Sequence, residues 1–491
     1  MYLGQMNKFL PVLLLFLTIT CYGASKSVAQ KAIIEREVII LAVNDIHATI
    51  DNFPRFAFMV DSLRAIYPDM LLVSAGDYQT GNPINDQYHE KGRPIIELMN
   101  HVEFDLSAVG NHEFDVGVKK FETYTKIVHF DHLCANLSSP EGMEFNIKPY
   151  KIITLPNGLK VGFVSVLALA SNNLPDCHPD NLVGFSFTNP FETAQKYLYL
   201  KDSTDLLIYI NHFGFENDVK LANLFPKGAV DLIIGGHSHT KVEKEQIHNG
   251  IMITQAGRKL NYATLIHLTV CPDGQVSRSM QLLTVGQTGN EQVAVRAMVD
   301  KYNNDPEMQE VIAKANFDFR TTDELGYWMA DALKATAKTE IAVVNKGGVR
   351  IDHLPAGEIT RKTIFTIDPF SNQVVTVNLT GHELKAFIGS MFGRYEYSLM
   401  YPSGIHLNYT VAEGGFKLID LELLNEDGTR LEMDKIYSVA TNSYVIATAD
   451  FKRKDPGKTL SITTSEGWIN WLLEEKTVKN YQEVKRVFIN E

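Results

Sequence analysis

Cysteine is scarce in this chain, with four residues among 491. They stand far apart, at Cys21, Cys134, Cys177 and Cys271. This spacing excludes a paired zinc-binding pattern and the dense framework of a small disulfide-rich domain, although one disulfide stays open. Apolar residues make up 45% of the sequence, which is enough for ordinary hydrophobic cores, and the length predicts two domains.

An excess of positive charge is also missing. The net charge is −12 and the isoelectric point is about 5.7. Phosphate backbones attract basic surfaces, so we expect no binding of a nucleic-acid polymer. A small phosphorylated substrate remains compatible with an acidic chain, because bound metal ions can supply positive charge locally.

Long apolar runs are absent after the N-terminal segment, so no transmembrane segment is expected once that segment is removed. Residues 9–19 follow Lys8, are mostly apolar, and are too few to span a bilayer. Small residues at 27–29 fit cleavage after Ala29. We therefore predict a signal peptide over residues 1–29 and an exported protein, either periplasmic, at the cell surface or secreted. An uncleaved N-terminal anchor and lipidation at Cys21 are the alternatives.

Residues 37–285 alternate short apolar runs with amphipathic stretches such as 56–66 and 94–100. The strand-like runs are 38–43, 71–74, 106–109, 161–166, 206–210 and 232–234. Such runs are typical of strands buried on both faces, and the alternation predicts an α/β sandwich. Helical periodicity at 291–299 predicts a linker helix within residues 286–319. A second α/β domain is expected over 320–491, with strands at 341–344, 374–379 and 437–440.

Polar side chains follow five of the predicted strands at the point where each strand ends. They are Asp45 and His47, Asp77, Asn111, His212, and His237 with His239. Functional residues of α/β sheets gather at the carboxyl ends of strands, so these side chains are expected to meet at one edge. Each alone has an ordinary structural explanation, and His212 by itself could be a buried core histidine. Their shared placement favours one common site.

Carboxylate, imidazole and carboxamide groups suit two divalent cations (zinc, manganese, magnesium or iron) and require no thiolate. The expected ligands are Asp45, His47 and His239 for one ion, and Asn111, His212 and His237 for the other. Asp77 is expected to bridge both ions with its two carboxylate oxygens. Two ions about 3.5–4 Å apart clamp a phosphate and activate a water for in-line attack.

His112 is expected to face the substrate, where a protonated imidazole stabilises the charge that builds on the phosphate. Asp115 can orient this imidazole and raise its pKa, with a helix N-cap as its other role. The histidines that lack a place at a strand end are expected on the surface or in the core. They are His89, His101, His129 and His132.

These motifs resemble those of the calcineurin-like metallophosphoesterases, and two of them resemble the 5′-nucleotidase branch in particular. The two are Gly-Asn-His-Glu-Phe-Asp at 110–115 and Gly-Gly-His-Ser-His-Thr at 235–240. The resemblance covers nearly the whole mature chain. It implies an N-terminal four-layer α/β/β/α metallophosphoesterase sandwich, a linker helix about which the domains rotate, and a second, smaller α/β domain that binds the substrate.

The C-terminal part carries further segments that resemble this family. They are residues 345–350, 369–372 and 442–444, followed by Asp450. The resemblance implies a set of substrate-binding residues: Asn345, Arg350 and Asn372 as substrate contacts, Phe370 and Tyr444 as rings that stack on the nucleobase, and Asp450 as a ribose contact. Residues 448–451 depart from the family's Gly-Gly-Asp-Gly, so the ribose pocket is expected to be reshaped.

The expected activity is the hydrolysis of nucleoside 5′-monophosphates, extending to nucleotide di- and triphosphates. Alternatives on the same scaffold are UDP-sugar hydrolysis and 2′,3′-cyclic phosphodiesterase with 3′-nucleotidase activity, with sulfur-ester hydrolysis a more distant one. A nucleotide-binding surface protein without catalysis is the alternative from another class. The complete ligand set and His112 argue against it.

Overall fold

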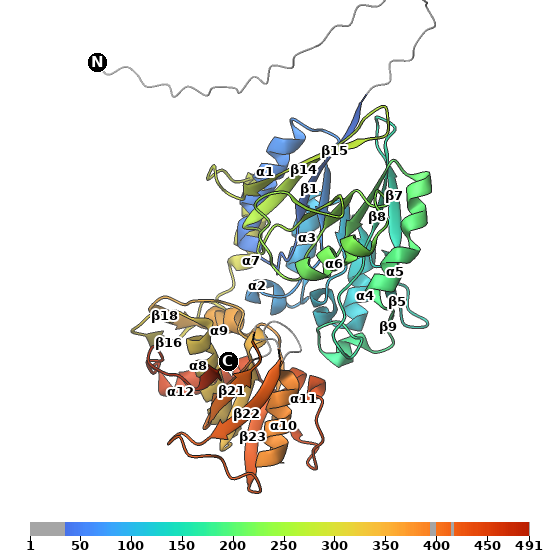
Figure 1. The fold of residues 1–491 in the computed structure, drawn as a ribbon. Helices are drawn as coiled ribbons and strands as arrows, with labels where there is room; N and C mark the ends of the chain where they lie inside the picture. The colour runs from blue at the N-terminus through green and yellow to red at the C-terminus, as the bar shows by residue number, and fades with distance from the viewer. Residues whose placement is uncertain (1–34, 393–398, 414–416, 491) are drawn as a thin grey trace, which may run out of the picture.

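The computed structural model describes residues 35–392, 399–413 and 417–490, so the predicted signal peptide lies outside the described residues. Figure 1 shows an N-terminal domain, blue to yellow-green, above a C-terminal domain that is yellow to red. The N-terminal domain holds a seven-stranded and a six-stranded sheet, and the C-terminal domain is built on a five-stranded sheet.

The two N-terminal sheets have strand orders β15-β14-β1-β2-β3-β4-β6 and β12-β13-β11-β10-β8-β7. The first consists of β1 (Arg36–Val43), β2 (Leu71–Ser74), β3 (Leu106–Ala108), β4 (Asp131–Leu133), β6 (Ile147–Lys148), β14 (Tyr262–Val270) and β15 (Val276–Thr284). The second consists of β7 (Tyr150–Thr154), β8 (Lys160–Val164), β10 (Leu206–Ile210), β11 (Leu232–Ile234), β12 (Gln246–His248) and β13 (Ile251–Thr254). Strands β1 to β4 run parallel, as do β8, β10, β11 and β13, so their carboxyl ends lie at one edge of each sheet.

Both faces of each N-terminal sheet are covered, which explains the near-continuous apolar runs. Along β1, Val38 and Ile40 pack between the two sheets, whereas Ile39 and Leu41 pack against the outer helices. The first sheet is covered by α1 (Phe53–Arg64), α3 (Arg93–Val102) and α4 (Val118–Ile127), and the second by α5 (Pro190–Lys196) and α6 (Phe215–Leu224). The expected α/β/β/α sandwich is confirmed.

Helix α7 (Val293–Asn303) follows the second sheet and is anchored on the N-terminal domain. At its start, the backbone N–H of Gln292 donates to the carbonyl oxygen of Pro54 at 2.8 Å. At its end, the side chain of Asn303 donates to Asp51 at 2.7 Å. The predicted linker helix therefore packs against α1 and α3, and the chain leaves the N-terminal domain after it.

The C-terminal sheet has the order β20-β17-β23-β19-β24. Its strands are β17 (Ile341–Asn345), β19 (Gln373–Thr380), β20 (Met400–Ser403), β23 (Ile436–Asn442) and β24 (Lys458–Thr463). One face packs on α8 (Thr322–Ala337) and α12 (Thr464–Glu475), where Trp328 meets Trp468 edge to face. The other face packs on α10 (Gly381–Met391) and on a small sheet of β21 (His406–Val411), β22 (Leu418–Leu424) and β25 (Val487–Asn490).

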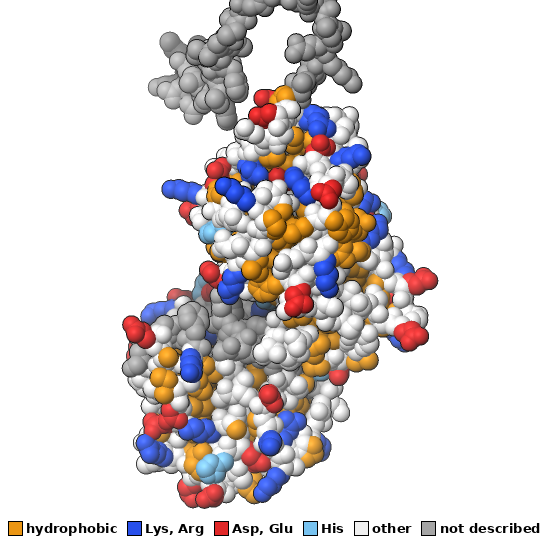
Figure 2. Space-filling view, turned by 45° about the vertical axis from the view of Figure 1, so that its right-hand side comes forward, with side chains coloured by type: hydrophobic (Ala, Val, Ile, Leu, Met, Phe, Trp, Pro, Cys, Tyr) orange, Lys and Arg blue, Asp and Glu red, His pale blue; other side chains and the backbone are white. Residues whose placement is uncertain are grey.

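Three features of the described chain bear on its class. Cys134, Cys177 and Cys271 carry unpaired thiols, so no disulfide joins the described cysteines. Among the described residues, no helix combines the length and the hydropathy needed to cross a bilayer. Figure 2 shows acidic and basic side chains interspersed over both domains on the face in view, without a large basic area.

Candidate metal centre and substrate cavity

The polar residues predicted from the strand ends come together where the carboxyl ends of the two sheets meet. Asp45 and His47 follow β1, Asp77 follows β2, Asn111 follows β3, His212 follows β10, and His237 and His239 follow β11. The first five are buried, and the two histidines after β11 are partly buried. The parallel order of β1, β2 and β3 in one sheet, and of β10 and β11 in the other, is what joins these distant positions.

The loops that carry these residues have an unusual backbone. Five of the seven residues have φ between 47° and 80°, a region that residues other than glycine seldom adopt. They are Asp45, His47, Asp77, His237 and His239. Such strain clusters at functional sites, where the surrounding structure holds it in place. Position 110 requires a glycine, because a Cβ atom there would lie 2.1 Å from Oδ1 of Asp77.

Asp45, His47 and His239 form the first cluster of potential ligands. Nε2 of His47 lies 3.0 Å from Nε2 of His239, and Oδ1 of Asp45 lies 3.4 Å from the same His239 atom. Two ligand atoms that each lie about 2.1 Å from one ion are themselves about 3 Å apart. The spacing therefore fits a shared cation. Nδ1 of His47 faces the carbonyl oxygen of Thr80 at 3.0 Å, which orients the ring.

Asp77, His212 and His237 form the second cluster. Oδ2 of Asp77 lies 3.1 Å from Nε2 of His212. Nδ1 of His237 lies 3.3 Å from that same nitrogen and 3.1 Å from Oδ1 of Asn111. Nδ1 of His212 contacts the carbonyl oxygen of Ala75 at 2.8 Å, which leaves Nε2 available as a potential ligand atom. Carboxylate, carboxamide and imidazole atoms at these distances fit a second divalent ion.

Asp77 lies between the two clusters, because it also groups with His47 and His112. Its Oδ1 accepts the backbone N–H of His112 at 2.9 Å, whereas its Oδ2 faces His212. Asp77 would therefore be available to cations held at either cluster. The bridging role itself stays a prediction.

His112 and Asp115 form a pair on the 3₁₀ turn η2 (His112–Val116). Nδ1 of His112 lies 2.6 Å from Oδ2 of Asp115, and its Nε2 lies 3.9 Å from Oδ2 of Asp77. Burial alone lowers the pKa of His112, but the carboxylates of Asp77 and Asp115 outweigh it and hold that pKa above its ordinary value. Asp115 does not cap the following helix, because Gly117 occupies the N-cap position of α4.

The candidate ligand histidines differ in their electrostatic surroundings. Burial, followed by the Arg350 guanidinium, holds the pKa of His47 well below its ordinary value, so its imidazole is neutral. Burial also disfavours charge on His212, but Asp77 outweighs it and raises the pKa of His212 to about 10. Positive charge is thus favoured beside Asp77, which is the charge that a divalent cation would provide.

Glu113 is a supporting residue to which the sequence pattern assigned no role. Its buried carboxylate accepts the backbone N–H groups of Asp77 at 3.0 Å, Tyr78 at 2.9 Å, Gln79 at 3.2 Å and Gly110 at 2.5 Å. It therefore ties the loop after β2 to the loop after β3. The position of Glu113 next to His112 is a signal visible in the sequence, but it does not indicate which backbone groups the carboxylate binds.

Gln255 is a second supporting residue that sequence reasoning missed. Its Nε2 donates to the carbonyl oxygen of Gly236 at 2.9 Å, and its Oε1 accepts the hydroxyl of Ser238 at 3.1 Å and the backbone N–H of Thr240. The amide thus holds both ends of the loop that carries His237 and His239. Gln255 directly follows β13, so the strand-end criterion would have found it.

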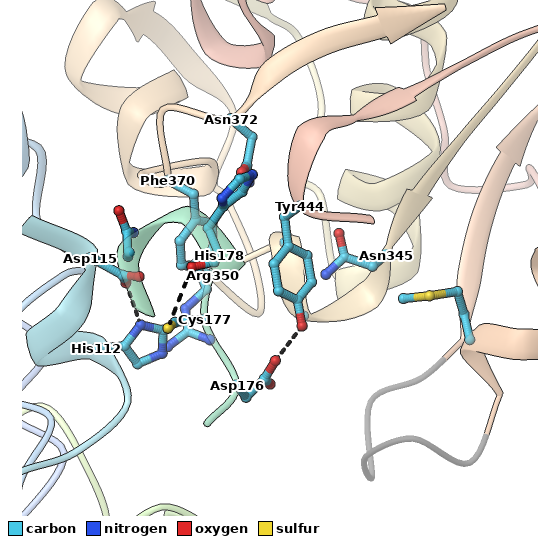
Figure 3. Close-up of a pocket in the computed structure, with 14 residues that line it drawn as sticks. His112, Asp115, Asp176, Cys177, His178, Asn345, Arg350, Phe370, Asn372 and Tyr444 are labelled. Carbon is cyan, nitrogen blue, oxygen red and sulfur yellow. Dashed lines mark hydrogen bonds and ion pairs between the residues drawn. The ribbon is translucent and has the colours of Figure 1, made fainter. Parts of the chain in front are cut away.

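A cavity of about 920 Å³, including its open mouth, lies between the domains beside His112. Five of the six residues expected to bind the substrate line it: Asn345, Arg350, Phe370, Asn372 and Tyr444. Figure 3 shows Phe370 and Tyr444 reaching into it from the C-terminal domain. The ring of Phe370 is stacked near that of His112, with 5.9 Å between ring centroids, and the Arg350 guanidinium lies 5.5 Å from the Phe370 ring.

The remaining expected residue, Asp450, is exposed and is not among the residues that line the cavity. Helix α11 (Ser443–Thr448) contains Tyr444 in its first turn and ends before Asp450. The N-terminal domain instead contributes a loop that the sequence pattern did not single out. From it, Asp176, Cys177, His178 and Asn181 line the cavity.

Comparisons with known proteins agree with this arrangement. Residues 39–241 match the family described as calcineurin-like phosphoesterase, and residues 306–451 match the 5′-nucleotidase C-terminal domain. The chain is 26% identical to a 5′-nucleotidase of Vibrio cholerae over 87% of this chain and 85% of that protein. It is 25% identical to the protein UshA of Escherichia coli over 76% of this chain and 77% of that protein. It also resembles the solved 5′-nucleotidase precursor of Thermus thermophilus, with a TM-score of 0.82 and 23% identity over 93% of this chain and 99% of that one. The chain therefore belongs to the two-domain 5′-nucleotidase family of calcineurin-like, metal-dependent phosphoester hydrolases.

Proposed function

We propose that this chain hydrolyses nucleoside 5′-monophosphates with two divalent cations held by the two clusters. One observation carries the proposal: a cavity runs from His112 to the aromatic side chains of the C-terminal domain. A nucleotide whose base is bound near Phe370 and Tyr444 would have its phosphate directed toward His112 and Asp77. The related 5′-nucleotidases of similar length support the same substrate class.

The chain's own residues have separable roles in this proposal. The chemistry that two divalent cations supply at such a site is polarisation of phosphoryl oxygens and activation of a water. The imidazole of His112, oriented by Asp115, donates to a phosphoryl oxygen as negative charge builds on it. Arg350 pairs with the phosphate through its planar fork. Phe370 stacks on the base, and this contact tolerates any base.

The domain division and the location of the protein complete the proposal. We assign residues 37–285 to the metal-binding domain, 286–319 to the linker and 320–491 to the substrate-binding domain. Tight binding of the remote base would then hold the phosphate in line for attack. A signal peptide at 1–29 and export to the periplasm or cell surface remain part of the proposal.

Phosphate release from a substrate panel tests the proposal. The purified protein is stripped with a chelator and reloaded separately with zinc, manganese, magnesium or iron. It is then assayed on 5′-AMP, 3′-AMP, 2′,3′-cyclic AMP, UDP-glucose and p-nitrophenyl phosphate. We expect metal-dependent turnover with 5′-AMP preferred over 3′-AMP. Equal turnover of the two, or full activity in chelator, would contradict the proposal.

A further inference from the structure

The segment between β13 and β14 lies along the loop that carries Asp45. The backbone N–H of Ala256 donates to Oδ1 of Asn44 at 2.7 Å, and the side-chain amide of Asn44 donates to the carbonyl oxygen of Gly257 at 2.6 Å. The backbone N–H of Lys259 donates to the carbonyl oxygen of Asp45 at 2.8 Å. The main chain of this segment is therefore fixed relative to a candidate metal ligand.

Lys259 has a strained backbone conformation. Its φ is 58° and that of Leu260 is 50°, in the left-handed region that residues with a side chain seldom adopt. The carbonyl oxygen of Lys259 accepts the side-chain amide of Asn52 at 3.0 Å, so hydrogen bonds hold the residue on both sides. Strain that the surroundings maintain in this way is typical of residues whose side chain has a functional position.

The side chain of Lys259 reaches from the N-terminal domain to the C-terminal domain. Its Nζ donates to the main-chain carbonyl oxygen of Arg350 at 3.2 Å. The backbone N–H of Arg350 donates to the carbonyl oxygen of Ile367 at 3.0 Å, within the C-terminal domain. The two peptide groups that flank Arg350 are therefore held by different domains.

The side chain of Arg350 lies against the candidate metal centre. Its Nη2 is 3.5 Å from both ring nitrogens of His47. Arg350 lines the substrate cavity and also an adjoining cavity whose wall contains Asp77 and His237. The place of this guanidinium relative to the metal-binding loops therefore depends on where the main chain of Arg350 is held.

A second contact between the same two segments is more exposed. Nη2 of Arg258 lies 2.5 Å from Oδ2 of Asp352, and the two side chains are 35% and 68% exposed. Exposed ion pairs contribute little, because water and salt screen them. The Lys259 contact is partly buried, and hydrogen bonds from charged groups are among the stronger ones. Lys259 is therefore the more effective of the two links to Arg350.

We propose that Lys259 is a positioning residue for the hydrolysis. By holding the main chain of Arg350 against the Asp45 loop, it places the Arg350 guanidinium beside the metal centre when the two domains meet. This inference rests on the proposed function, because it takes Arg350 to pair with the phosphate of the substrate. Lys259 is not among the residues that line either cavity, so it acts through Arg350 rather than on the substrate.

A double-mutant cycle tests the assignment. Lys259→Met removes the amine but leaves the backbone N–H that holds Asp45, so the metal content should stay unchanged. We expect it to lower kcat/KM for 5′-AMP about 10- to 100-fold, the usual effect of losing a hydrogen bond from a charged group. In an Arg350→Met background the same substitution should change kcat/KM by less than about 2-fold, because the residue that it positions is gone. Lys244→Met is the matched control, since Lys244 is an exposed lysine of the same domain.

Two further variants separate positioning from a general structural role. Lys259→Arg keeps a charged donor on a long side chain and should recover most of the lost kcat/KM. Arg258→Gln should lower kcat/KM by less than about 5-fold, because its ion pair is exposed. Equal losses from Lys259→Met with and without the Arg350 side chain, or loss of metal from Lys259→Met, would overturn the inference. A larger loss from Arg258→Gln than from Lys259→Met would overturn it as well.

Binding of inorganic phosphate distinguishes failure of this inference from failure of the proposed function. Phosphate is titrated into the zinc-loaded full chain by calorimetry, which needs neither turnover nor a nucleoside. Weaker binding in Lys259→Met than in Lys244→Met, seen only while Arg350 is present, would support the positioning role even if 5′-AMP released no phosphate and the proposed activity failed. Phosphate release from 5′-AMP with equal kcat/KM in these two variants would keep the activity and sink the inference.

Discussion

Nδ1 of His112 lies 2.6 Å from Oδ2 of Asp115, and both residues belong to the same 3₁₀ turn. The contact places the opposite nitrogen, Nε2, on the side of the Asp77 carboxylate at 3.9 Å. The pair borders the substrate cavity, and its geometry is set within three residues of chain. The imidazole is therefore oriented by a residue of its own turn, which makes the pair a direct target for mutation.

We expect His112→Ala to lower turnover of 5′-AMP by about 10²–10³-fold, because a charge-stabilising donor is lost. The metal content, measured by mass spectrometry, should stay unchanged. Asp115→Asn should cause a smaller loss, since the imidazole remains but loses its charged partner. Unchanged turnover in His112→Ala would remove this residue from the mechanism.

Asp77→Asn should lose metal from both positions, because Asp77 belongs to the second cluster and also groups with His47, a member of the first. The measurement is the number of zinc or manganese ions per chain after dialysis, together with phosphate release. Asp61→Asn, on the exposed face of α1, is the matched control and should bind metal normally. Retention of two ions and of the unaltered rate in Asp77→Asn would show that the bridge assignment is wrong.

Gln255→Ala should weaken metal affinity by about 10- to 100-fold, the usual range for residues that orient ligands. The reason is that the amide holds Gly236 and Thr240 on either side of His237 and His239. Metal titration of the stripped protein measures this. Gln246→Ala, on the exposed strand β12, serves as control. The same affinity in Gln255→Ala as in the control would mean that the loop holds its shape without this amide.

Phe370→Ala should raise KM for 5′-AMP about 10-fold or more, because stacking on a base contributes about 1–3 kcal/mol. Turnover of p-nitrophenyl phosphate, which has no nucleobase, should change little. Steady-state kinetics on the two substrates measure the difference. An equal loss on both would show that Phe370 supports His112, whose ring it also contacts, rather than the base.

The stability of the C-terminal domain should fall as pH rises through the range in which Asp368 ionises. Burial raises the pKa of Asp368 from its ordinary 3.8 to about 6 in the folded chain. The folded state therefore binds this proton more tightly than the unfolded chain does. Its contribution is complete below pH 3.8 and is lost as pH rises toward 6, by about 3 kcal/mol at most.

Asp368→Asn removes this ionisation, so the variant should be more stable than the unaltered protein at pH 7.5 and close to it at pH 4. Urea unfolding followed by tryptophan fluorescence measures the difference, because the three tryptophans, at 328, 468 and 471, all lie in the C-terminal domain. Asp434→Asn is the control, since the Asp434 side chain is fully exposed. A stability difference that is the same at both pH values would contradict the assignment.

The candidate metal centre could be predicted because its signals are local. Strands that are buried on both faces appear in the sequence as apolar runs, and Asp77 and His212 each follow such a run closely. The rule that parallel strands share an edge then brings these residues together without any coordinates. The alternation of apolar runs and amphipathic stretches predicted an α/β sandwich, and the family resemblance implied its four layers, whose sheets bury alternate residues of β1 on opposite sides.

The substrate cavity depended on information that no local pattern contains. Asp176 lies in an irregular loop without periodicity, and its place beside Tyr444 follows from how the two domains meet. The family resemblance pointed to Asp450, yet this residue is exposed and is not among those that line the cavity. The sequence by itself thus determined the sheets, the strand ends and the groups gathered there, because backbone hydrogen bonding and apolar burial impose them locally. Only the tertiary structure decided which side chains border the substrate cavity, because contacts between two separately folded domains depend on their relative orientation.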